Sequence, residues 1–154
     1  IRMIKQAAPT LVVIARTDAK GVEGIEAAAE RAQRYIDAGA DGIFPEALTS
    51  EEEFAYFSRQ IQAPLLANMT EFGKTPYFTA KQFEDWGYRM VIYPVSSLRV
   101  AALAVEKLFR DIFEKGTQVD CLEQMLTREQ LYDLIRYYDY EALDATIART
   151  VLPK

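Results

Sequence analysis

Histidine is absent from the 154-residue sequence. This absence excludes catalytic triads and general bases that depend on imidazole, and it excludes most zinc sites. Cys121 is the only cysteine, so an internal disulfide is impossible, and we expect a reducing compartment, the cytoplasm. Any catalysis by this chain must use Arg, Lys, Asp, Glu, Tyr or hydroxyl side chains, or groups that another chain supplies.

Long apolar runs and clusters of basic residues are also lacking. No run approaches the roughly 20 residues that a membrane-spanning helix needs, so we expect no membrane span. The net charge is −5 and Lys and Arg occur singly, which argues against a nucleic-acid partner. No glycine-rich loop follows a predicted strand, which disfavours nucleotide binding. Half of the residues are apolar, which suits one globular unit.

Four apolar segments of strand length are each followed by a segment of helical pattern. The predicted strands cover residues 10–17, 42–44, 64–67 and 90–93. The predicted helices cover 22–38, a segment that opens at Ser50, a segment that opens at Thr79, and 97–115. Ser50, Thr79 and Thr127 each precede a Glu or Gln by three residues, which is the signature of a capping box.

This alternation predicts an α/β fold with a parallel sheet. A closed eight-stranded barrel needs about 250 residues, so four strand–helix units amount to half of one. We therefore expect the second half of a (β/α)8 TIM barrel over 1–116, with a small open doubly wound sheet as the alternative. The opening IRMIKQAAP reads as the end of a helix, so we expect a further segment before Ile1.

Residues 117–154 belong to no strand–helix unit and form a predicted helical tail. The tail is either a cap on the barrel or an arm that packs on a neighbouring subunit. Its tyrosines lie among aliphatic residues, which favours the second interpretation.

Polar residues follow each of the four predicted strands. They are Arg16, Glu46, Asn68 with Thr70, and Ser96 with Arg99. Each has an ordinary structural explanation, such as an ion pair of Arg16 with Asp18 or Glu46. In a barrel, however, the strand ends converge on one face. Two guanidinium groups, an amide and a hydroxyl there would suit a small, polyanionic, oxygen-rich substrate, but they include no obvious proton-transfer group.

Several motifs resemble one enzyme family in colinear order. The segments LVVIARTDA, AGADGIFPEA, PLLANMTEFGKTP and TREQLYDLIRYYDYE together are similar to the second half of the methylisocitrate lyases. That family lies within the isocitrate lyase and phosphoenolpyruvate mutase superfamily. The NMTEFGKTP segment and the tail are specific to it, whereas ARTDA is shared more widely.

The resemblance implies a Mg²⁺-dependent (β/α)8 barrel that cleaves 2-methylisocitrate to pyruvate and succinate in propionate catabolism. It also implies a homotetramer that exchanges a C-terminal helix. By match of motif, it assigns substrate binding to Arg16, Glu46, Asn68, Met69, Thr70, Arg99 and Arg128.

Two motifs of the family are missing from the sequence. The family's general acid/base is a cysteine in a Lys-Arg-Cys-Gly-His-like loop, and its metal ligands lie in an Asp-x-Asp-x-Gly-x-Gly-like loop. Cys121 lies in neither motif, and we interpret it as an ordinary buried or tail cysteine. We therefore expect no catalytic residue and no metal ligand in this chain, and no lyase activity from the chain alone.

Two alternatives stay open. One is a phosphonomutase or an oxaloacetate decarboxylase on the same scaffold. The other is a non-catalytic assembly module whose contact surface is the tyrosine-rich tail.

Overall fold

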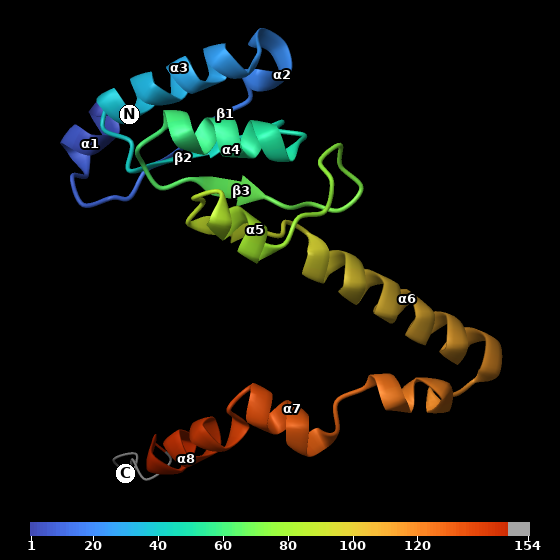
Figure 1. The fold of residues 1–154 in the computed structure, drawn as a ribbon. Coiled ribbons are helices and arrows are strands. Elements are labelled where there is room, and N and C mark those ends of the chain that lie inside the picture. The colour runs from blue at the N-terminus through green and yellow to red at the C-terminus, as the bar shows by residue number, and fades with distance from the viewer. Residues whose placement is uncertain (148–154) are drawn as a thin grey trace. The chain divides into compact units, whose positions relative to one another are not determined.

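The computed structural model describes residues 1–147, and the chain divides into two compact units, Ile1–Val100 and Ala101–Lys154 (Figure 1). The first unit alternates strands with helices. Helix α6 (Ser96–Lys115) begins in the first unit and continues into the second, whose other described elements are also helical.

Four parallel strands form the centre of the first unit. They are β1 (Ile14–Thr17), β2 (Gly42–Pro45), β3 (Leu66–Asn68) and β4 (Met90–Ile92). Strand β1 pairs with β2 and β3 pairs with β4, and an isolated parallel bridge between Ile43 and Leu65 joins the two pairs. The spatial order therefore follows the chain order, and the residues after all four strands lie at the same edge.

Helices occupy the connections between the strands. α1 (Arg2–Ala7) precedes β1, and the connections hold α2 (Lys20–Glu23), α3 (Ile25–Asp37), α4 (Glu51–Gln60) and α5 (Ala80–Asp85). Ser50 and Thr79 accept the predicted capping hydrogen bonds at the starts of α4 and α5. Gly39 and Gly87 follow α3 and α5 with positive φ, as helix-terminating glycines do.

The buried side chains of the first unit come from the strands, from the inner faces of α3, α4 and α5, and from the loops that adjoin them. The largest fully buried ones are Phe57, Phe83, Ile43, Leu48 and Leu65. An aromatic cluster between α4 and α5 has ring centroids 5.0–5.9 Å apart and consists of Phe54, Phe78, Phe83, Trp86 and Tyr88. All these pairs pack edge-to-face except Phe54 and Trp86, which stack, and this packing fixes the rings and, through them, the two helices that follow β2 and β3.

Two predicted elements are shorter than the sequence pattern indicates. The helix predicted over 22–38 breaks at Gly24, whose φ of 92° lies outside the helical region, and Val22 is exposed rather than on the buried stripe. The strand predicted from residue 10 begins at Ile14, because its partner β2 begins opposite, at Gly42. Leu11 and Val12 have no pairing strand among the described residues and are exposed.

The second unit holds a 3₁₀ helix η1 (Val119–Gln124), α7 (Arg128–Leu134) and α8 (Tyr137–Ile147). Thr127 makes the predicted capping box at the start of α7. The last described helix of the predicted tail, α8, begins at Tyr137, and residues 148–154 of the tail lie outside the described part of the chain. The rings of Tyr132 and Tyr137 stack with centroids 4.3 Å apart.

Cys121 is buried in the second unit. Its Sγ donates to Asp111 Oδ2 at 3.2 Å, and Lys115 pairs with the other oxygen of Asp111 at 2.7 Å. The hydrogen bond to Asp111 raises the pKa of the Cys121 thiol. A thiol held in the protonated form is a poor nucleophile, which agrees with the interpretation of Cys121 as an ordinary buried cysteine.

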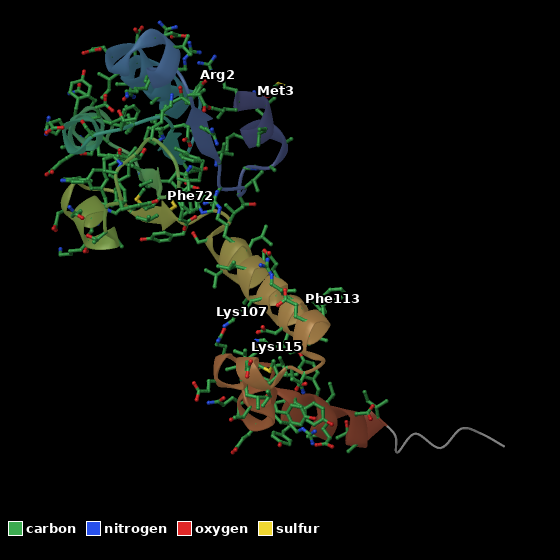
Figure 2. The ribbon with its side chains drawn as sticks, turned by 90° about the vertical axis from the view of Figure 1, so that its right-hand side faces the viewer. Arg2, Met3, Phe72, Lys107, Phe113 and Lys115 are labelled. Atoms are coloured by element: carbon green, nitrogen blue, oxygen red, sulfur yellow. The ribbon has the colours of Figure 1, made fainter. Side chains whose placement is uncertain are left out.

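Helix α6 carries its predicted apolar stripe, but that stripe is exposed. Leu98, Val105 and Ile112 are 64%, 49% and 41% exposed, and Phe113, labelled in Figure 2, is 91% exposed. The periodicity correctly indicates an amphipathic helix, but it does not indicate what covers the apolar face. Within residues 1–147, no helix combines the length and apolar character that crossing a membrane requires.

Candidate functional site at the carboxyl ends of the strands

Glu46 joins side chains from three neighbouring strand ends. Its Oε2 lies 3.3 Å from Asn68 Nδ2, which donates to it, and 3.6 Å from Arg16 Nη2. Strand β1 ends at Thr17, β2 at Pro45 and β3 at Asn68, so the backbone register brings the three groups to one edge. The structure thus places a guanidinium, a carboxylate and an amide in one cluster, as the strand-end pattern predicts.

Asn68 presents an unused acceptor at this edge. Its Oδ1 is buried, and no described protein group donates to it. Because Nδ2 is directed at the Glu46 carboxylate, the amide orientation is fixed by electrostatics. A buried carbonyl oxygen without a donor is costly, so this atom is suited to receive a hydrogen bond from a ligand.

Arg16 is held from two sides. Its Nε and Nη2 donate to both carboxylate oxygens of Asp18, at 3.0 and 2.7 Å, and its guanidinium carbon lies 5.1 Å from the centre of the Phe44 ring. The Asp18 hydrogen bonds raise the pKa of Arg16, and the same bonds lower the pKa of Asp18. The ion pairs with Asp18 and Glu46 that the sequence allowed are therefore both present, and they orient a guanidinium that is still half exposed.

A cavity of about 430 Å³ opens beside Glu46 and Asn68. Most of its lining residues have polar side chains, and they lie at or directly after the ends of β1, β2 and β3. The lining residues are Lys20, Gly21, Glu46, Ala47, Thr49, Asn68, Thr70, Gly73, Lys74 and Thr75. Arg16 lines a neighbouring cavity of about 360 Å³ together with Asp18.

Four cavity residues with polar side chains, Lys20, Thr49, Lys74 and Thr75, were not among the predicted site residues. Lys20 pairs with Glu53 at 2.9 Å and contacts Thr49, and the Thr75 hydroxyl donates to the carbonyl of Leu48 at 2.7 Å. The sequence feature that could have identified these residues is their position in the segments that follow the predicted strands.

Three other predicted site residues have distinct surroundings. The Met69 side chain is buried, and its sulfur accepts from the Phe78 N–H, so the side chain is part of the core. Arg99, in the first turn of α6, pairs with Glu71 at 2.6 Å. Arg128 is the first residue of α7, in the second unit.

Backbone strain marks the loops after β2, β3 and β4. Ala47, Phe72 and Val95 have φ values of 64°, 61° and 57°, in the left-handed region that non-glycine residues seldom adopt. Val95 is β-branched, for which this region is especially unfavourable. Such strain concentrates at functional sites, where the surrounding structure enforces it.

The residues described do not form a metal centre. Within 1–147, no group of three or more His, Cys, Asp or Glu side chains lies close enough to hold a metal ion. Glu46 is occupied by Arg16 and Asn68, and Asp18 by Arg16. The Mg²⁺ that the family resemblance implies therefore does not fit a site made by these residues alone.

The chain belongs to the phosphoenolpyruvate phosphomutase family, whose model matches residues 1–113. A 2-methylisocitrate lyase of Bacillus subtilis (strain 168) is 62% identical over 153 residues, which cover 99% of this chain and 51% of that protein. One from Aeropyrum pernix is 59% identical over 138 residues, which cover 90% of this chain and 45% of that protein.

A solved structure has the same fold. The crystal structure of 2,3-dimethylmalate lyase, a PEP mutase/isocitrate lyase superfamily member, matches with a TM-score of 0.81 at 30% identity. The match covers 94% of this chain and 51% of that one. The chain thus spans about half the length of the curated relatives it matches.

Proposed function

We propose that this chain is the C-terminal half of a 2-methylisocitrate lyase, which cleaves 2-methylisocitrate to pyruvate and succinate. The observation that carries the proposal is the Arg16–Glu46–Asn68 cluster, in a chain 59–62% identical to proteins of that name. We further propose that the four strand–helix units of 1–116 form half of a (β/α)8 barrel and that 117–154 is a tail. The complete enzyme, meaning the protein with all strands of the barrel, would carry the activity.

The cluster is suited to this reaction. Cleaving the C–C bond of a hydroxy-tricarboxylate turns the hydroxyl-bearing carbon into a carbonyl and leaves negative charge on the departing dicarboxylate. The Arg16 guanidinium and the Asn68 amide can bind carboxylate oxygens and stabilise such charge. Glu46 can accept a hydrogen bond from the substrate hydroxyl. Thr70, Met69 through its backbone, and Arg99 would complete the carboxylate contacts that the first unit supplies.

The proton-transfer group and the metal ligands would come from the other half of the barrel. When bound, Mg²⁺ would polarise substrate oxygens as a Lewis acid. The described residues contribute substrate binding, and the buried Cys121, whose thiol pKa is raised, is not suited to act as the base.

A homotetramer is part of the proposal. Support comes from the exposed apolar side chains of α6, α7 and α8, which include Phe113, Leu134 and Leu143. Large exposed apolar patches mark interaction surfaces, so an exchanged C-terminal helix would cover them. The alternative of an assembly module without catalysis uses the same surface but gives no role to the strand-end cluster.

Replacing Arg16 with Ala in the complete enzyme tests the function. The loss of a charged carboxylate contact should lower kcat/KM by about 1.5–3 kcal/mol, roughly 10- to 150-fold. Arg34→Ala is the matched control, because Arg34 makes an exposed ion pair with Glu30 on α3. A complete enzyme that cleaves a phosphonate or oxaloacetate in preference to 2-methylisocitrate would support the alternative activities, and an unchanged kcat/KM in Arg16→Ala would support the assembly module.

A further inference from the structure

Glu71, in the loop after β3, is bonded to two residues of the first turn of α6. Its Oε1 accepts from the Ser96 hydroxyl, and its Oε2 accepts from Arg99 Nη1 at 2.6 Å. The same Nη1 also donates to the main-chain carbonyl of Glu71 at 3.1 Å. Glu71 and Arg99 are 28 residues apart in sequence, so this contact fixes the loop after β3 against the start of α6.

The backbone on either side of this contact is strained. Phe72, next to Glu71, has a φ of 61°, and Val95, next to Ser96, has a φ of 57°. Phe72, labelled in Figure 2, is 86% exposed. Its ring centre lies 5.3 Å from the Arg99 guanidinium carbon. Core packing does not explain why Phe72 adopts an unfavourable backbone conformation with an exposed ring. The cation–π contact of the ring with Arg99 gives Phe72 a role in holding the guanidinium.

The geometry leaves one edge of the Arg99 guanidinium for a ligand. Within the described residues, the hydrogen bonds from Arg99 to Glu71 all use Nη1. Arginine has five N–H donors in a planar fork, so Nε and Nη2 can bind a carboxylate with two parallel hydrogen bonds. Hydrogen bonds from the Ser96 hydroxyl, from the Glu71 main chain and from the Arg99 side chain lower the pKa of Glu71, so the carboxylate that holds Arg99 remains ionised near neutral pH.

We propose that Glu71 is a positioning residue that, with Ser96 and Phe72, holds the Arg99 guanidinium ready to bind a carboxylate of the substrate. This inference rests on the proposed function, because it takes Arg99 as a substrate-binding residue. Glu71 itself does not touch the substrate. It acts through Arg99 by removing the rotational freedom that an exposed arginine would lose on binding.

A double-mutant cycle in the complete enzyme tests the coupling. Glu71→Gln should weaken succinate binding and lower kcat/KM roughly tenfold, mainly through KM, because it removes a charge-assisted bond but keeps the side-chain shape. Arg99→Ala should cause a larger loss. In the double variant, Glu71→Gln should add no further loss, because its effect requires Arg99.

The matched control is Glu84→Gln, which removes an exposed carboxylate that pairs with Lys81 on α5. It should change neither the dissociation constant for succinate nor kcat/KM. Thermal unfolding of every variant separates a positioning role from a structural one. If Glu71 were merely structural, Glu71→Gln would lower the Tm, and the losses in kcat/KM of Glu71→Gln and Arg99→Ala would be additive. Additive losses, or an unchanged affinity for succinate in Arg99→Ala, would overturn the role of Glu71.

Succinate binding, measured by calorimetry, separates this inference from the proposed function. A wild-type enzyme that binds succinate with Glu71–Arg99 coupling but releases no pyruvate from 2-methylisocitrate would refute only the proposed function. Wild-type cleavage with additive variants would refute only the positioning role. A wild-type enzyme that neither binds succinate nor cleaves the substrate would refute both.

Discussion

At the carboxyl end of β2, a single oxygen of Glu46 is shared between the Arg16 guanidinium and the Asn68 amide. The sequence placed all three residues at strand ends, and parallel pairing brings such ends together. Their order in the sheet, and the choice of Glu46 as the shared acceptor, required the observed register. Because the Glu46 carboxylate accepts from Asn68 Nδ2, the Oδ1 atom of Asn68 remains for a ligand.

Asn68→Asp should make substrate binding depend on pH. The substitution places a second carboxylate within hydrogen-bond distance of Glu46, and two carboxylates that close raise the pKa of one of them. Where both carboxylates are ionised, kcat/KM should fall roughly 10- to 100-fold through repulsion and the lost donor. As the pH is lowered the pair takes up one proton, the hydrogen bond is restored, and the loss should shrink.

The measurement is the ratio of wild-type to variant kcat/KM between pH 8 and about pH 5. Asn68→Ala is the control, because it lacks the added carboxyl group and its deficit should not recover at low pH. A deficit of Asn68→Asp that is the same at all pH values would contradict the close approach of Asn68 to Glu46.

Among the helices, the three predicted caps differ in how completely they form. Thr79 and Thr127 make reciprocal capping boxes with Gln82 and Gln130. At α4, Ser50 accepts from the Glu53 N–H at 3.4 Å, but the Glu53 side chain bonds to the N–H of Thr49 instead of that of Ser50. Lys20, which pairs with the same Glu53 oxygen, is a tertiary partner that the local motif does not contain.

Replacing Thr79 with Ala should destabilise the complete enzyme by about 1 kcal/mol, because the N–H of Gln82 loses its acceptor at the start of α5. Thr79→Ser keeps the hydroxyl and should lower the free energy of unfolding by only a few tenths of that amount. Urea unfolding of both variants gives the comparison. Equal losses in the two variants would show that the methyl group of Thr79, not the cap, is what matters.

For the molecule as a whole, the informative feature is the pairing of the two outer strands of the sheet, β1 and β4. In the described part of the chain, β1 and β4 each pair with a single neighbour. Open edges of a parallel sheet are normally paired or covered, because exposed N–H and C=O groups invite further strands. This agrees with the proposal that further strands close a barrel around the strand-end site.

The chain alone should therefore release no pyruvate from 2-methylisocitrate, whereas the complete enzyme should. The physical reason is that the cluster of Arg16, Glu46 and Asn68 binds and orients the substrate, whereas the proposed proton-transfer group and metal ligands would come from the other half of the barrel. The assay follows pyruvate with a coupled dehydrogenase at equal molar concentrations of the two proteins. Magnesium-dependent turnover by the chain alone, at a rate near that of the complete enzyme, would contradict the proposal.

What the sequence determined by itself is local. Alternating strand and helix patterns, glycines after α3 and α5, the caps at Thr79 and Thr127, and polar residues after each strand all follow from periodicity and backbone preferences within a few residues. Local patterns did not predict the helix break at Gly24 or the start of β1 at Ile14. The start of β1 depends on where its partner strand β2 begins.

The tertiary structure alone decided which distant groups meet. Asn68 reaches Glu46 across 22 positions, and Arg99 reaches Glu71 across 28. These contacts depend on strand register and on strained loops at Phe72 and Val95, whose conformations cost energy locally and persist only because the surrounding fold enforces them. Local preference would have placed these two residues in ordinary turns, so only the folded chain determines where the Arg99 guanidinium lies.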